Sequence, residues 1–424
     1  MIIYTVKPGD TVTSISQTFG IPAERIILDN ELDPDRLSPG QAIMIAYRSQ
    51  IYTVREGDSL WTIAAKFGIT VNRLWQNNPI LGGKSDIYPG QTLVISYADA
   101  KRGSLETTGY IYTFADRNVV RKTLPYLTYL AIFSYGIRAD GSLVVPDDRE
   151  LIQLSLEYGT KPMLVLTSLG DDGVFSTETV SQLLNDPTAV DNLISNLVET
   201  CEAKDYAAVN SDFEYIPPED RSKYTAFIEK LSRALNAIGR ILSVSLAPKQ
   251  TGDQPGLLYE AIDYPALGRA ADQAFLMTYE WGYTYSEPRA VAPIDQVKKV
   301  VDYAAGVIPR NKIVMGMPNY GYNWKLPWVE GTAAKSLSNA EAVRLANENG
   351  AVIKYDGLAA TPYFNYTDES GAHEVWFEDA RSVNAKLALA SDEKLLGIGV
   401  WNVTRWFTQL WFMLNVLYNI KRDD

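Results

Sequence analysis

From residue 107 onward, short apolar runs alternate with longer stretches in which apolar residues recur at helical spacing. The apolar runs predict strands at residues 107–112, 126–136, 162–167, 207–214, 241–246, 274–279, 313–317 and 397–402. The periodic stretches predict helices at 147–158, 190–204, 219–238 and 295–307. Strands that alternate with helices in this way predict an α/β fold, a closed (β/α)8 TIM barrel.

The spacing between the seventh and eighth strands is too long for one crossover connection. Residues 320–380 contain strand-like pieces at 351–355 and 374–377 and a helical pattern that begins at Asn339. We therefore expect an inserted α+β subdomain, at about 322–380, within a barrel domain that covers 107–424.

The chain before the barrel contains an internal repeat. IYTVKPGDTVTSISQTFGIPAERIILDN at 3–30 realigns with IYTVREGDSLWTIAAKFGITVNRLWQNN at 51–78, and LSPGQAIMIA and IYPGQTLVIS then close the two copies. Each copy predicts a strand, two helices and a strand, because a Gly-Asp-Thr or Gly-Asp-Ser turn supplies a helix N-cap after the first strand. We place the copies at 1–47 and 50–97 and expect a linker at 98–106.

Both copies resemble the LysM module, a small βααβ fold that binds glycans containing N-acetylglucosamine, such as peptidoglycan and chitin. The shared features are YTVxxGDT/S, the FGI step, the asparagine pair and the PGQ turn. The resemblance implies a glycan groove between the loop after the first strand and the loop after the second helix. Its residues would be Gly9, Asp10, Thr11, Leu28 and Asn30, and in the second copy Gly57, Asp58, Ser59, Leu60, Asn77, Asn78, Pro79 and Ile80. A purely structural repeat is the alternative.

Composition excludes several classes of function. A formal net charge of −12 without a basic stripe argues against a nucleic-acid or anionic-membrane partner. No apolar run approaches the ~20 residues of a membrane span. One cysteine, Cys201, excludes an intrachain disulfide, and one histidine, His373, leaves almost no material for a zinc site or a histidine-based triad. We expect neither a metal nor a cofactor.

The stretch YAAVNSDFEY at 206–215 predicts a buried strand that ends in carboxylates. Because side chains alternate along a strand, Asn210, Asp212 and Glu214 would share one face. Burying such a row without partners would cost about 2–7 kcal/mol per unsatisfied polar group, so a chemical role is the usual reason for it. Catalytic groups of a (β/α)8 barrel lie at this end of the strands. A salt-bridged surface pair is the alternative.

Residues 207–214 resemble the DGxDxDxE motif on the fourth strand of the family-18 glycoside hydrolases. The resemblance extends to GYIY at 109–112, MTYEW at 277–281, GMPNYGYNW at 316–324 and Trp401, and to the insertion after the seventh strand. It implies a retaining glycosidase in which the substrate's own 2-acetamido group attacks the anomeric carbon, an exception to the scheme with two catalytic carboxylates.

The resemblance also implies a role for each matching residue. Glu214 would be the general acid and then the base, with a pKa raised by the Asp212 charge and by partial burial. Asp212 would orient and charge-stabilise the acetamido group, and Tyr279 would donate a hydrogen bond to its oxygen. Further substrate contacts would come from an apolar floor at Trp401 and from Asn210, Tyr110, Met277, Glu280, Asn319 and Tyr320.

One departure from the family motif concerns Asn210, which stands where the family has an aspartate, and the alanines that precede it in place of Asp-Gly. An aspartate there can share a proton with Asp212, whereas an amide can only form hydrogen bonds. We therefore expect Asp212 to stay ionised and the pH profile to differ from that of the family.

Two LysM modules ahead of a family-18 barrel resemble the SleL/YaaH-type spore cortex-lytic (germination) N-acetylglucosaminidases. The resemblance implies a monomer whose partners are muramic-lactam-containing glycan strands of cortex peptidoglycan, and spore coat proteins. The resemblance also implies a location in the spore coat or cortex, and the N-terminal MIIYTVKPGD, which lacks the pattern of a secretory signal, fits that expectation. The alternatives are a chitinase of the same fold and a catalytically inert glycan-binding coat or wall protein.

Overall fold

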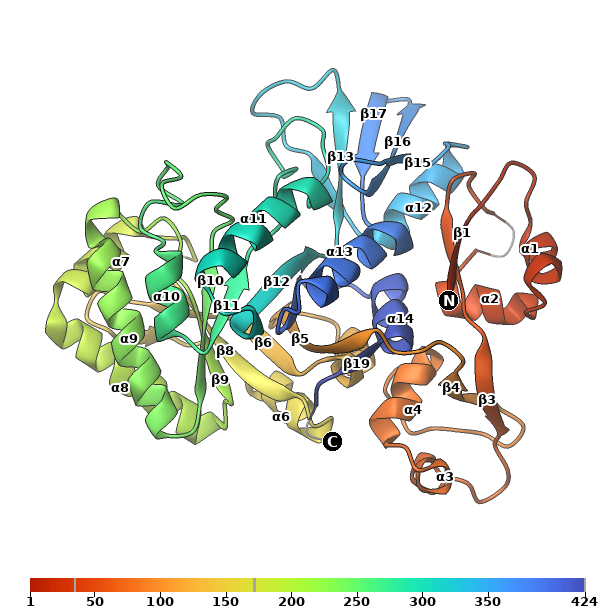
Figure 1. Ribbon diagram of the computed structural model, residues 1–424, viewed down its shortest axis with the longest axis horizontal. Coiled ribbons are helices and arrows are strands. Elements are labelled where there is room, and N and C mark those ends of the chain that lie inside the picture. The colour runs from red at the N-terminus through yellow and green to blue at the C-terminus, as the bar shows by residue number, and fades with distance from the viewer. Residues whose placement is uncertain (34–35, 171–172, 423–424) are drawn as a thin grey trace.

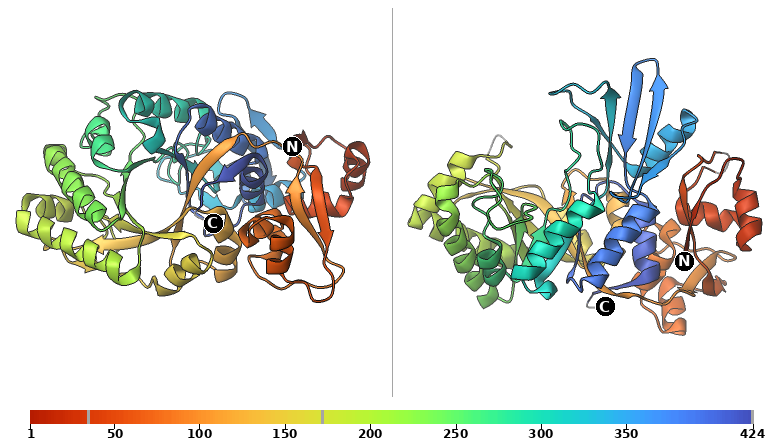
Figure 2. Two further views of the ribbon diagram at one scale, coloured as in Figure 1. Left: turned by 60° about the horizontal axis from the view of Figure 1, so that its bottom comes forward. Right: turned by 45° about the horizontal axis from the view of Figure 1, so that its top comes forward.

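The computed structural model describes residues 1–33, 36–170 and 173–422 (Figure 1). Its centre is a ring of parallel strands, in which β5 pairs with both β6 and β18 and closes the barrel (Figure 2, left). The strands are β5 (Gly103–Tyr112), β6 (Tyr129–Ile137), β8 (Lys161–Thr167), β9 (Ala208–Asp212), β10 (Ile241–Leu246), β11 (Gln273–Leu276), β12 (Ile313–Pro318) and β18 (Gly397–Trp401). The predicted (β/α)8 barrel is confirmed.

Helices surround the ring and bury their apolar faces against the strands. They are α5 (Arg117–Thr123), α6 (Arg149–Glu157), α7 (Thr177–Asn185), α8 (Pro187–Lys204), α9 (Arg221–Ala237), α10 (Tyr264–Ala270), α11 (Ile294–Val307), α13 (Ala380–Asp392) and α14 (Thr408–Leu417). Every residue of α14 except Gln409 is buried, because this helix packs on the barrel with one side and on the N-terminal modules with another. Within the part of the chain that the structure describes, no helix is both long and apolar enough to cross a membrane.

Strands β9 and β11 end earlier than the sequence predicts, at Asp212 and Leu276. Glu214 and Tyr279 therefore lie in the loops just beyond the strands. After β9 the chain turns at Tyr215, which has a positive φ of 55°. After β11 the Thr278 hydroxyl donates to the Gly316 carbonyl of β12 at 2.8 Å, in place of a further backbone pairing. Loss of parallel pairing, which the apolar pattern does not record, sets both ends.

The predicted alternation along β9 is confirmed for its outer face. The Ser211 hydroxyl lies 3.2 Å from the Tyr224 hydroxyl of α9, and the Phe213 ring stacks on Phe227 of the same helix at 5.8 Å. Asn210 and Asp212, which alternate with these residues, therefore face the barrel interior.

The insertion after β12 forms an antiparallel sheet above the C-terminal ends of the barrel strands (Figure 2, right). Its elements are β13 (Gly321–Leu326), β14 (Lys335–Leu337), α12 (Asn339–Glu348), β15 (Lys354–Asp356), β16 (Thr361–Asp368) and β17 (Gly371–Trp376), with strand order β14-β13-β17-β16-β15. Buried Ala342 and Ala346 of α12 pack against Phe364 and Val375 of the sheet. The predicted α+β insertion is confirmed.

Each repeat forms the predicted βααβ module. The first contains β1 (Ile2–Thr5), α1 (Val12–Phe19), α2 (Ala23–Asn30) and β2 (Ala42–Ile45), and the second contains β3 (Arg48–Thr53), α3 (Leu60–Phe67), α4 (Val71–Asn77) and β4 (Thr92–Tyr97). Thr11 and Ser59 cap α1 and α3 with reciprocal capping boxes, as the Gly-Asp-Thr/Ser pattern predicts. Strand β5 begins at Gly103, inside the stretch 98–106 expected as a linker, because β19 (Tyr418–Ile420) pairs with its first residues.

The second module docks on the barrel through α4. The side-chain amide of Asn415 on α14 donates to the Gln76 carbonyl at 3.0 Å and to the Asn77 Oδ1 at 2.9 Å. Gln76 in turn donates to the Pro125 carbonyl at 2.7 Å. Because these partners are buried, the C-terminal end of α4 lies in the buried interface between the second module and the outer helices of the barrel.

The first module docks on the insertion through its PGQ turn. The Ile353 N–H donates to the Pro39 carbonyl at 2.9 Å. A Cβ atom at Gly40 would lie 1.8 Å from the Ile353 carbonyl oxygen, so only glycine permits this approach. The equivalent Gly90 of the second module has no heavy atom within 4 Å of such a Cβ. The two modules therefore use different surfaces to dock.

Candidate active site and glycan-binding surfaces

The two predicted catalytic carboxylates lie together at the open end of the barrel. Asp212 is the last residue of β9 and is 6 % exposed, and its Oδ1 atom has no hydrogen-bond partner among the described residues. Burial raises the pKa of Asp212 to about 6. Burial, followed by the charges of Asp212 and Glu280, raises the pKa of Glu214 to about 8. A carboxylic acid that keeps its proton near neutral pH beside an ionised carboxylate suits general acid catalysis.

Two serines on β10 hold Asn210, and sequence reasoning missed both. The Asn210 amide nitrogen donates to the Ser243 hydroxyl at 3.2 Å, and the Ser245 hydroxyl donates to Asn210 Oδ1 at 3.2 Å. Hydrogen bonding from Ser245 also opposes the rise in the pKa of Asp212. The signal was present in the alternation of ILSVSL, which places both serines on one face of a buried strand.

Aromatic side chains form the floor beside the carboxylates. Tyr110 of β5 is 2 % exposed and stacks on Phe275 at 4.8 Å, and the Trp401 ring lies 6.0 Å from Tyr110 and 5.0 Å from Phe133. Met277 packs against the same cluster. The structure therefore brings these predicted substrate-binding residues together over the barrel interior.

Tyr279 faces the same carboxylates. Burial, and then the negative charge of Asp212, raises the pKa of the Tyr279 hydroxyl well above its usual value. The hydroxyl therefore stays protonated across the working range of an enzyme and is available as a hydrogen-bond donor.

Glu280 follows in a left-handed backbone conformation with φ 66°. Its carboxylate accepts hydrogen bonds from the Tyr320 hydroxyl and, at 3.3 Å, from the Tyr322 hydroxyl. Burial raises the pKa of Glu280, and the two tyrosine hydrogen bonds lower it. Because a non-glycine residue reaches this conformation only at a cost, the surrounding tyrosines hold Glu280 in a set position.

The side-chain amide of Asn319 serves the loop that follows β18. Asn319 is 2 % exposed, and its nitrogen donates to the Asn402 carbonyl at 3.0 Å and the Arg405 carbonyl at 2.7 Å. Both amide hydrogens of Asn319 are therefore used by the backbone and help to position this loop. A contact between Asn319 and substrate would fall to its Oδ1 atom and stays a prediction.

Four of the predicted glycan-binding residues of the LysM modules are buried, which corrects the prediction for them. Asn30 bridges the Ile26 carbonyl and both backbone polar groups of Met44, and Asn78 makes the same bridges to Leu74 and Val94. These asparagines join the end of a helix to the closing strand. Asn77 is 3 % exposed and Leu60 is 1 % exposed, so their side chains lie in the interface and the core.

The other predicted LysM residues lie on turns and helix starts. Asp10 and Asp58 each accept a backbone N–H and a tyrosine hydroxyl, which closes the turn after the first strand. Gly9 and Gly57 occupy this turn with φ of 86° and 81°. Thr11 and Ser59 are the N-caps, and Pro79 begins a short 3-10 helix. Leu28 and Ile80 are 42 % and 65 % exposed, so a contact of these two with glycan stays a prediction.

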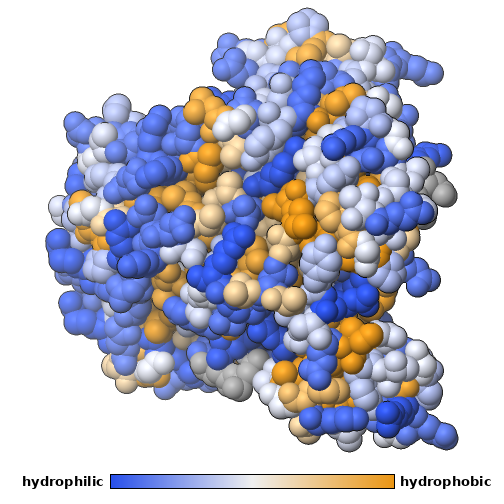
Figure 3. Space-filling model, turned by 45° about the vertical axis from the view of Figure 1, so that its right-hand side comes forward, coloured by the Kyte–Doolittle hydropathy of each residue, from blue (hydrophilic) through white to orange (hydrophobic). Residues whose placement is uncertain are grey.

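The second module has an exposed aromatic residue that sequence reasoning did not select. Trp61, in the first turn of α3, is 70 % exposed and lies two residues after the Ser59 cap. The equivalent residue of the first module is Thr13. The alignment of the two repeats therefore shows that an aromatic residue stands at this position in the second module only. The second module forms the lower lobe in Figure 3, and apolar side chains reach its surface there, Ile51 and Ile80 among its exposed residues.

A hollow of about 390 Å³, which we term the flanking hollow, adjoins the aromatic floor. The loops after β5 and β18 and the base of the insertion line it with Tyr112, Phe114, Ala115, Asp116, Asn319, Tyr320, Ser336, Asn402, Thr404 and Arg405. The Tyr112 ring lies 5.7 Å from the Trp401 ring. Burial, and to a smaller extent the charge of Asp212, raises the pKa of the Tyr112 hydroxyl. The hollow therefore shares Tyr112 with the aromatic floor beside the catalytic carboxylates.

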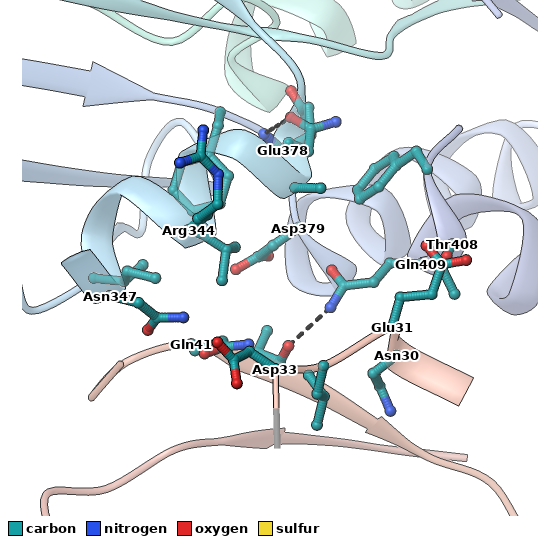
Figure 4. Close-up of a pocket in the computed structure, with 18 of the residues that line it drawn as sticks. Asn30, Glu31, Asp33, Gln41, Arg344, Asn347, Glu378, Asp379, Thr408 and Gln409 are labelled. Atoms are coloured by element: carbon teal, nitrogen blue, oxygen red, sulfur yellow. Dashed lines mark hydrogen bonds between the residues drawn. The ribbon is translucent and has the colours of Figure 1, made fainter. Parts of the chain in front are cut away.

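A second cavity, of about 340 Å³, lies between the first module and the insertion (Figure 4). Asn30, Glu31 and Gln41 face Arg344 and Asn347 of α12 across it. None of the predicted catalytic residues line it. Gln409 donates to the Ala42 carbonyl at 2.8 Å at its edge, so the cavity belongs to the docking interface of the first module.

Comparison with known proteins gives two family matches and several relatives of similar length. The glycosyl hydrolases family 18 model matches residues 101–405, and the LysM domain model matches residues 4–46 and 52–96. The cortical fragment-lytic enzyme of Bacillus subtilis is 39 % identical to this chain, over 100 % of this chain and 99 % of that enzyme. The cortical fragment-lytic enzyme of Bacillus anthracis is 37 % identical, over 99 % of each chain.

Solved structures agree with these matches. The Bacillus cereus spore cortex-lytic enzyme SleL aligns with a TM-score of 0.84 at 36 % identity, over 99 % of this chain and 98 % of that structure. A chitinase from Chromobacterium violaceum aligns with a TM-score of 0.68 at 27 % identity, over 74 % of this chain and 98 % of its own. The family model covers most of the chain, including the barrel strands and the carboxylate pair, and a relative matches over the whole chain. This chain therefore belongs to glycosyl hydrolase family 18.

Proposed function

We propose that this protein is a peptidoglycan hydrolase of the spore cortex, a retaining N-acetylglucosaminidase whose LysM modules hold the glycan. The observation that carries the proposal is the pair of Glu214, with a pKa raised above neutrality, and buried Asp212 beside Tyr279 and the Trp401 floor. The full-length similarity to enzymes named for cortical fragments supports the substrate class and a location in the spore.

The first step forms a cyclic intermediate from the substrate alone. An N-acetylglucosamine ring lies on Trp401, and the oxygen of its 2-acetamido group attacks the anomeric carbon. The bond from that carbon to the glycosidic oxygen breaks while Glu214 gives its proton to the leaving oxygen. The positive charge of the resulting oxazolinium ion is stabilised by the Asp212 carboxylate, and the Tyr279 hydroxyl donates to the acetamido oxygen during its attack.

The second step returns the proton and restores the sugar. Glu214, now a carboxylate, takes a proton from water, and the hydroxide that forms attacks the anomeric carbon and opens the ring of the intermediate. Two inversions at the same carbon give retention of configuration. A muramic lactam has no free acetamido group to attack in this way, so cleavage follows N-acetylglucosamine.

Asn210 supports this cycle without joining the proton exchange. Its amide is fixed by Ser243 and Ser245 and cannot accept a proton from Asp212. Asp212 therefore carries its negative charge through both steps at neutral pH.

The experiment that tests the proposal is mass spectrometry of the products from purified spore cortex, vegetative peptidoglycan and chitin oligomers. The matched control is Glu214→Gln, which keeps the size of the side chain and removes the transferable proton. We expect fragments with reducing-end N-acetylglucosamine, rich in muramic lactam, from the unaltered protein only. Glu214→Gln should still bind the same glycans, which is measured by the change in tryptophan fluorescence when a sugar ring covers Trp401.

Two other results would replace the proposal. Products from chitin alone would identify a chitinase, an alternative that the similarity to the Chromobacterium violaceum chitinase supports. No product from any of the three substrates would indicate an inert glycan-binding protein of the spore coat or wall.

A further inference from the structure

The flanking hollow has an aromatic wall with one free face. The rings of Tyr112 and Phe114 stack at 5.1 Å with an angle of 14° between their planes. Phe114 is 80 % exposed, so the face of its ring that turns away from Tyr112 is open to solvent. Tyr320 closes another side of the hollow. A flat aromatic surface with polar groups around it matches the apolar face and the hydroxyl rim of a sugar ring.

The hollow also holds a cation, Arg405. Hydrogen bonds from Ser338, and after them the charge of Arg405, lower the pKa of the Glu341 carboxyl. Arg405 is exposed, and its guanidinium contacts the Ser336 hydroxyl at 3.4 Å without an ion pair to any described residue. The only carboxylate in the lining, Asp116, is used at the start of α5, where it accepts the Asn118 N–H at 2.7 Å and the Val119 N–H at 3.3 Å. Arg405 is thus available to an anionic ligand, and a guanidinium matches a carboxylate in shape and charge.

The order of the strands, taken with the proposed role of Glu214, indicates which part of the glycan would reach the hollow. Around the ring, β9 lies opposite β18. Glu214 follows β9 and protonates the leaving oxygen, so the departing part of the glycan lies on the β9 side. The hollow lies on the side of β5 and β18, beyond Trp401. With the proposed mechanism, the hollow is thus placed to receive the sugar that precedes the cleaved N-acetylglucosamine.

In peptidoglycan this preceding sugar is a muramic acid residue, and in chitin it is a neutral N-acetylglucosamine. Muramic acid carries a lactyl group that ends in a carboxylate or in a stem peptide with carboxylates, whereas the lactam form has lost that carboxylate. We propose that Arg405 pairs with a carboxylate carried by the muramic residue that precedes the cleaved N-acetylglucosamine, and so selects acidic peptidoglycan strands over neutral glycans. This inference rests on the proposed peptidoglycan substrate.

The test uses the full chain and four defined tetrasaccharides. The sugar before the cleaved N-acetylglucosamine is N-acetylmuramic acid with a free carboxylate, the same residue with a peptide stem, its lactam, or N-acetylglucosamine as in chitotetraose. Arg405→Gln should raise KM on the carboxylate-bearing substrates by about three- to tenfold with kcat unchanged, as for an accessible charged hydrogen bond. KM on the lactam and on chitotetraose should change by less than about twofold.

The matched control is Lys335→Gln, which removes the same charge from the residue next to Ser336. Side chains alternate along β14, so Lys335 points away from the face that lines the hollow, and its variant should leave every KM unchanged. A response with only one of the two acidic substrates would assign the carboxylate to the lactyl group or to the peptide. Equal losses on all four substrates, or no change on any, would overturn the inference.

A binding measurement separates this inference from the proposed function. Glu214→Gln and the double variant with Arg405→Gln are titrated with the same tetrasaccharides at low and high salt. Weaker binding of the acidic ligands by the double variant, lessened at high salt, supports the inference even if turnover is absent. Equal binding by the two variants overturns it. Absence of turnover by the unaltered protein contradicts the proposed function alone.

Discussion

The hydroxyl of Ser245 donates to Asn210 Oδ1 at 3.2 Å across the pairing of β10 with β9. A neutral amide is therefore held in a fixed orientation one strand pleat behind Asp212. In the family motif this position carries a third carboxylate. The consequence is that Asp212 and Glu214 titrate without a further charge between β9 and β10.

Replacing Asn210 by aspartate tests the role of this amide. A carboxylate behind Asp212 disfavours a second negative charge, so Asn210→Asp should raise the pKa of Asp212 and move the acidic limb of kcat/KM to higher pH, by about one unit. The measurement is the pH dependence of kcat/KM on a chitotetraose substrate. Ser211→Ala, on the outer face of the same strand, is the control and should leave the profile in place. An unchanged acidic limb in Asn210→Asp would show that position 210 does not act through charge.

The unaltered enzyme should have a bell-shaped pH profile. The proposed mechanism needs Asp212 ionised and Glu214 protonated, and burial raises their pKa values to about 6 and about 8. The value of kcat/KM should therefore rise through pH 6, reach its maximum near pH 7 and fall through pH 8, as a property of the coupled pair. Glu280→Gln removes a charge that raises the pKa of Glu214, so its alkaline limb should move to lower pH. A rate that still increases above pH 9 in the unaltered enzyme would exclude Glu214 as the acid.

Asp212→Asn should stabilise the fold while it abolishes activity. The pKa of Asp212 is raised in the folded protein, so the folded state is penalised once this group ionises. The penalty is absent below the ordinary pKa near 4 and complete above about 6, where it amounts to roughly 3 kcal/mol. Urea unfolding should show Asp212→Asn more stable than the unaltered protein at pH 7.5 and equal to it at pH 3.5. A variant that is less stable at both values would show that Asp212 holds the fold together.

Gly40→Ala should release the first module from the insertion. A methyl group at Gly40 would collide with the Ile353 carbonyl, whereas Gly90→Ala meets no atom within 4 Å. Both glycines have φ near 90°, so both variants share the strain of the left-handed region, about 1 kcal/mol. Only Gly40→Ala should increase the radius of gyration in small-angle scattering and the rate of proteolysis between the modules. Identical behaviour of the two variants would place the docking elsewhere.

Trp61→Ala should weaken glycan binding by the second module, by about three- to tenfold in Kd. Trp61 is 70 % exposed, so its removal costs little stability, while a sugar face loses an aromatic partner. Binding to insoluble peptidoglycan is compared in the Glu214→Gln background, where no substrate is consumed. Thr13→Ala, at the equivalent place in the first module, is the control and should bind unchanged. Equal Kd values for Trp61→Ala and the control would mean that this surface does not contact glycan.

The repeat, the barrel strands and the carboxylate pair could be predicted from sequence because each is a local pattern. An apolar run, a helical period or a Gly-Asp-Thr turn is encoded within a few residues, and 207–214 carries the motif in one stretch. Where the strands end was not predicted, because β9 and β11 stop where their neighbours no longer pair.

The roles of several polar residues could not be predicted for a similar reason. In the sequence, Asn30 and Asn78 look like residues of a ligand-binding loop. In the fold, the closing strand of each module lies opposite them, and their side chains form buried hydrogen bonds to its backbone. Ser245 matters because β10 lies beside β9, and Arg405 matters because the loops after β5 and β18 meet at the base of the insertion.

Sequence alone determined which elements form in this protein and which carboxylates are the candidates for its chemistry, since both depend on neighbours in the chain. The tertiary structure decided what surrounds those carboxylates, how far their pKa values rise, and where the two LysM modules are held. These properties depend on burial and on contacts between residues hundreds of positions apart, such as Gly40 with Ile353.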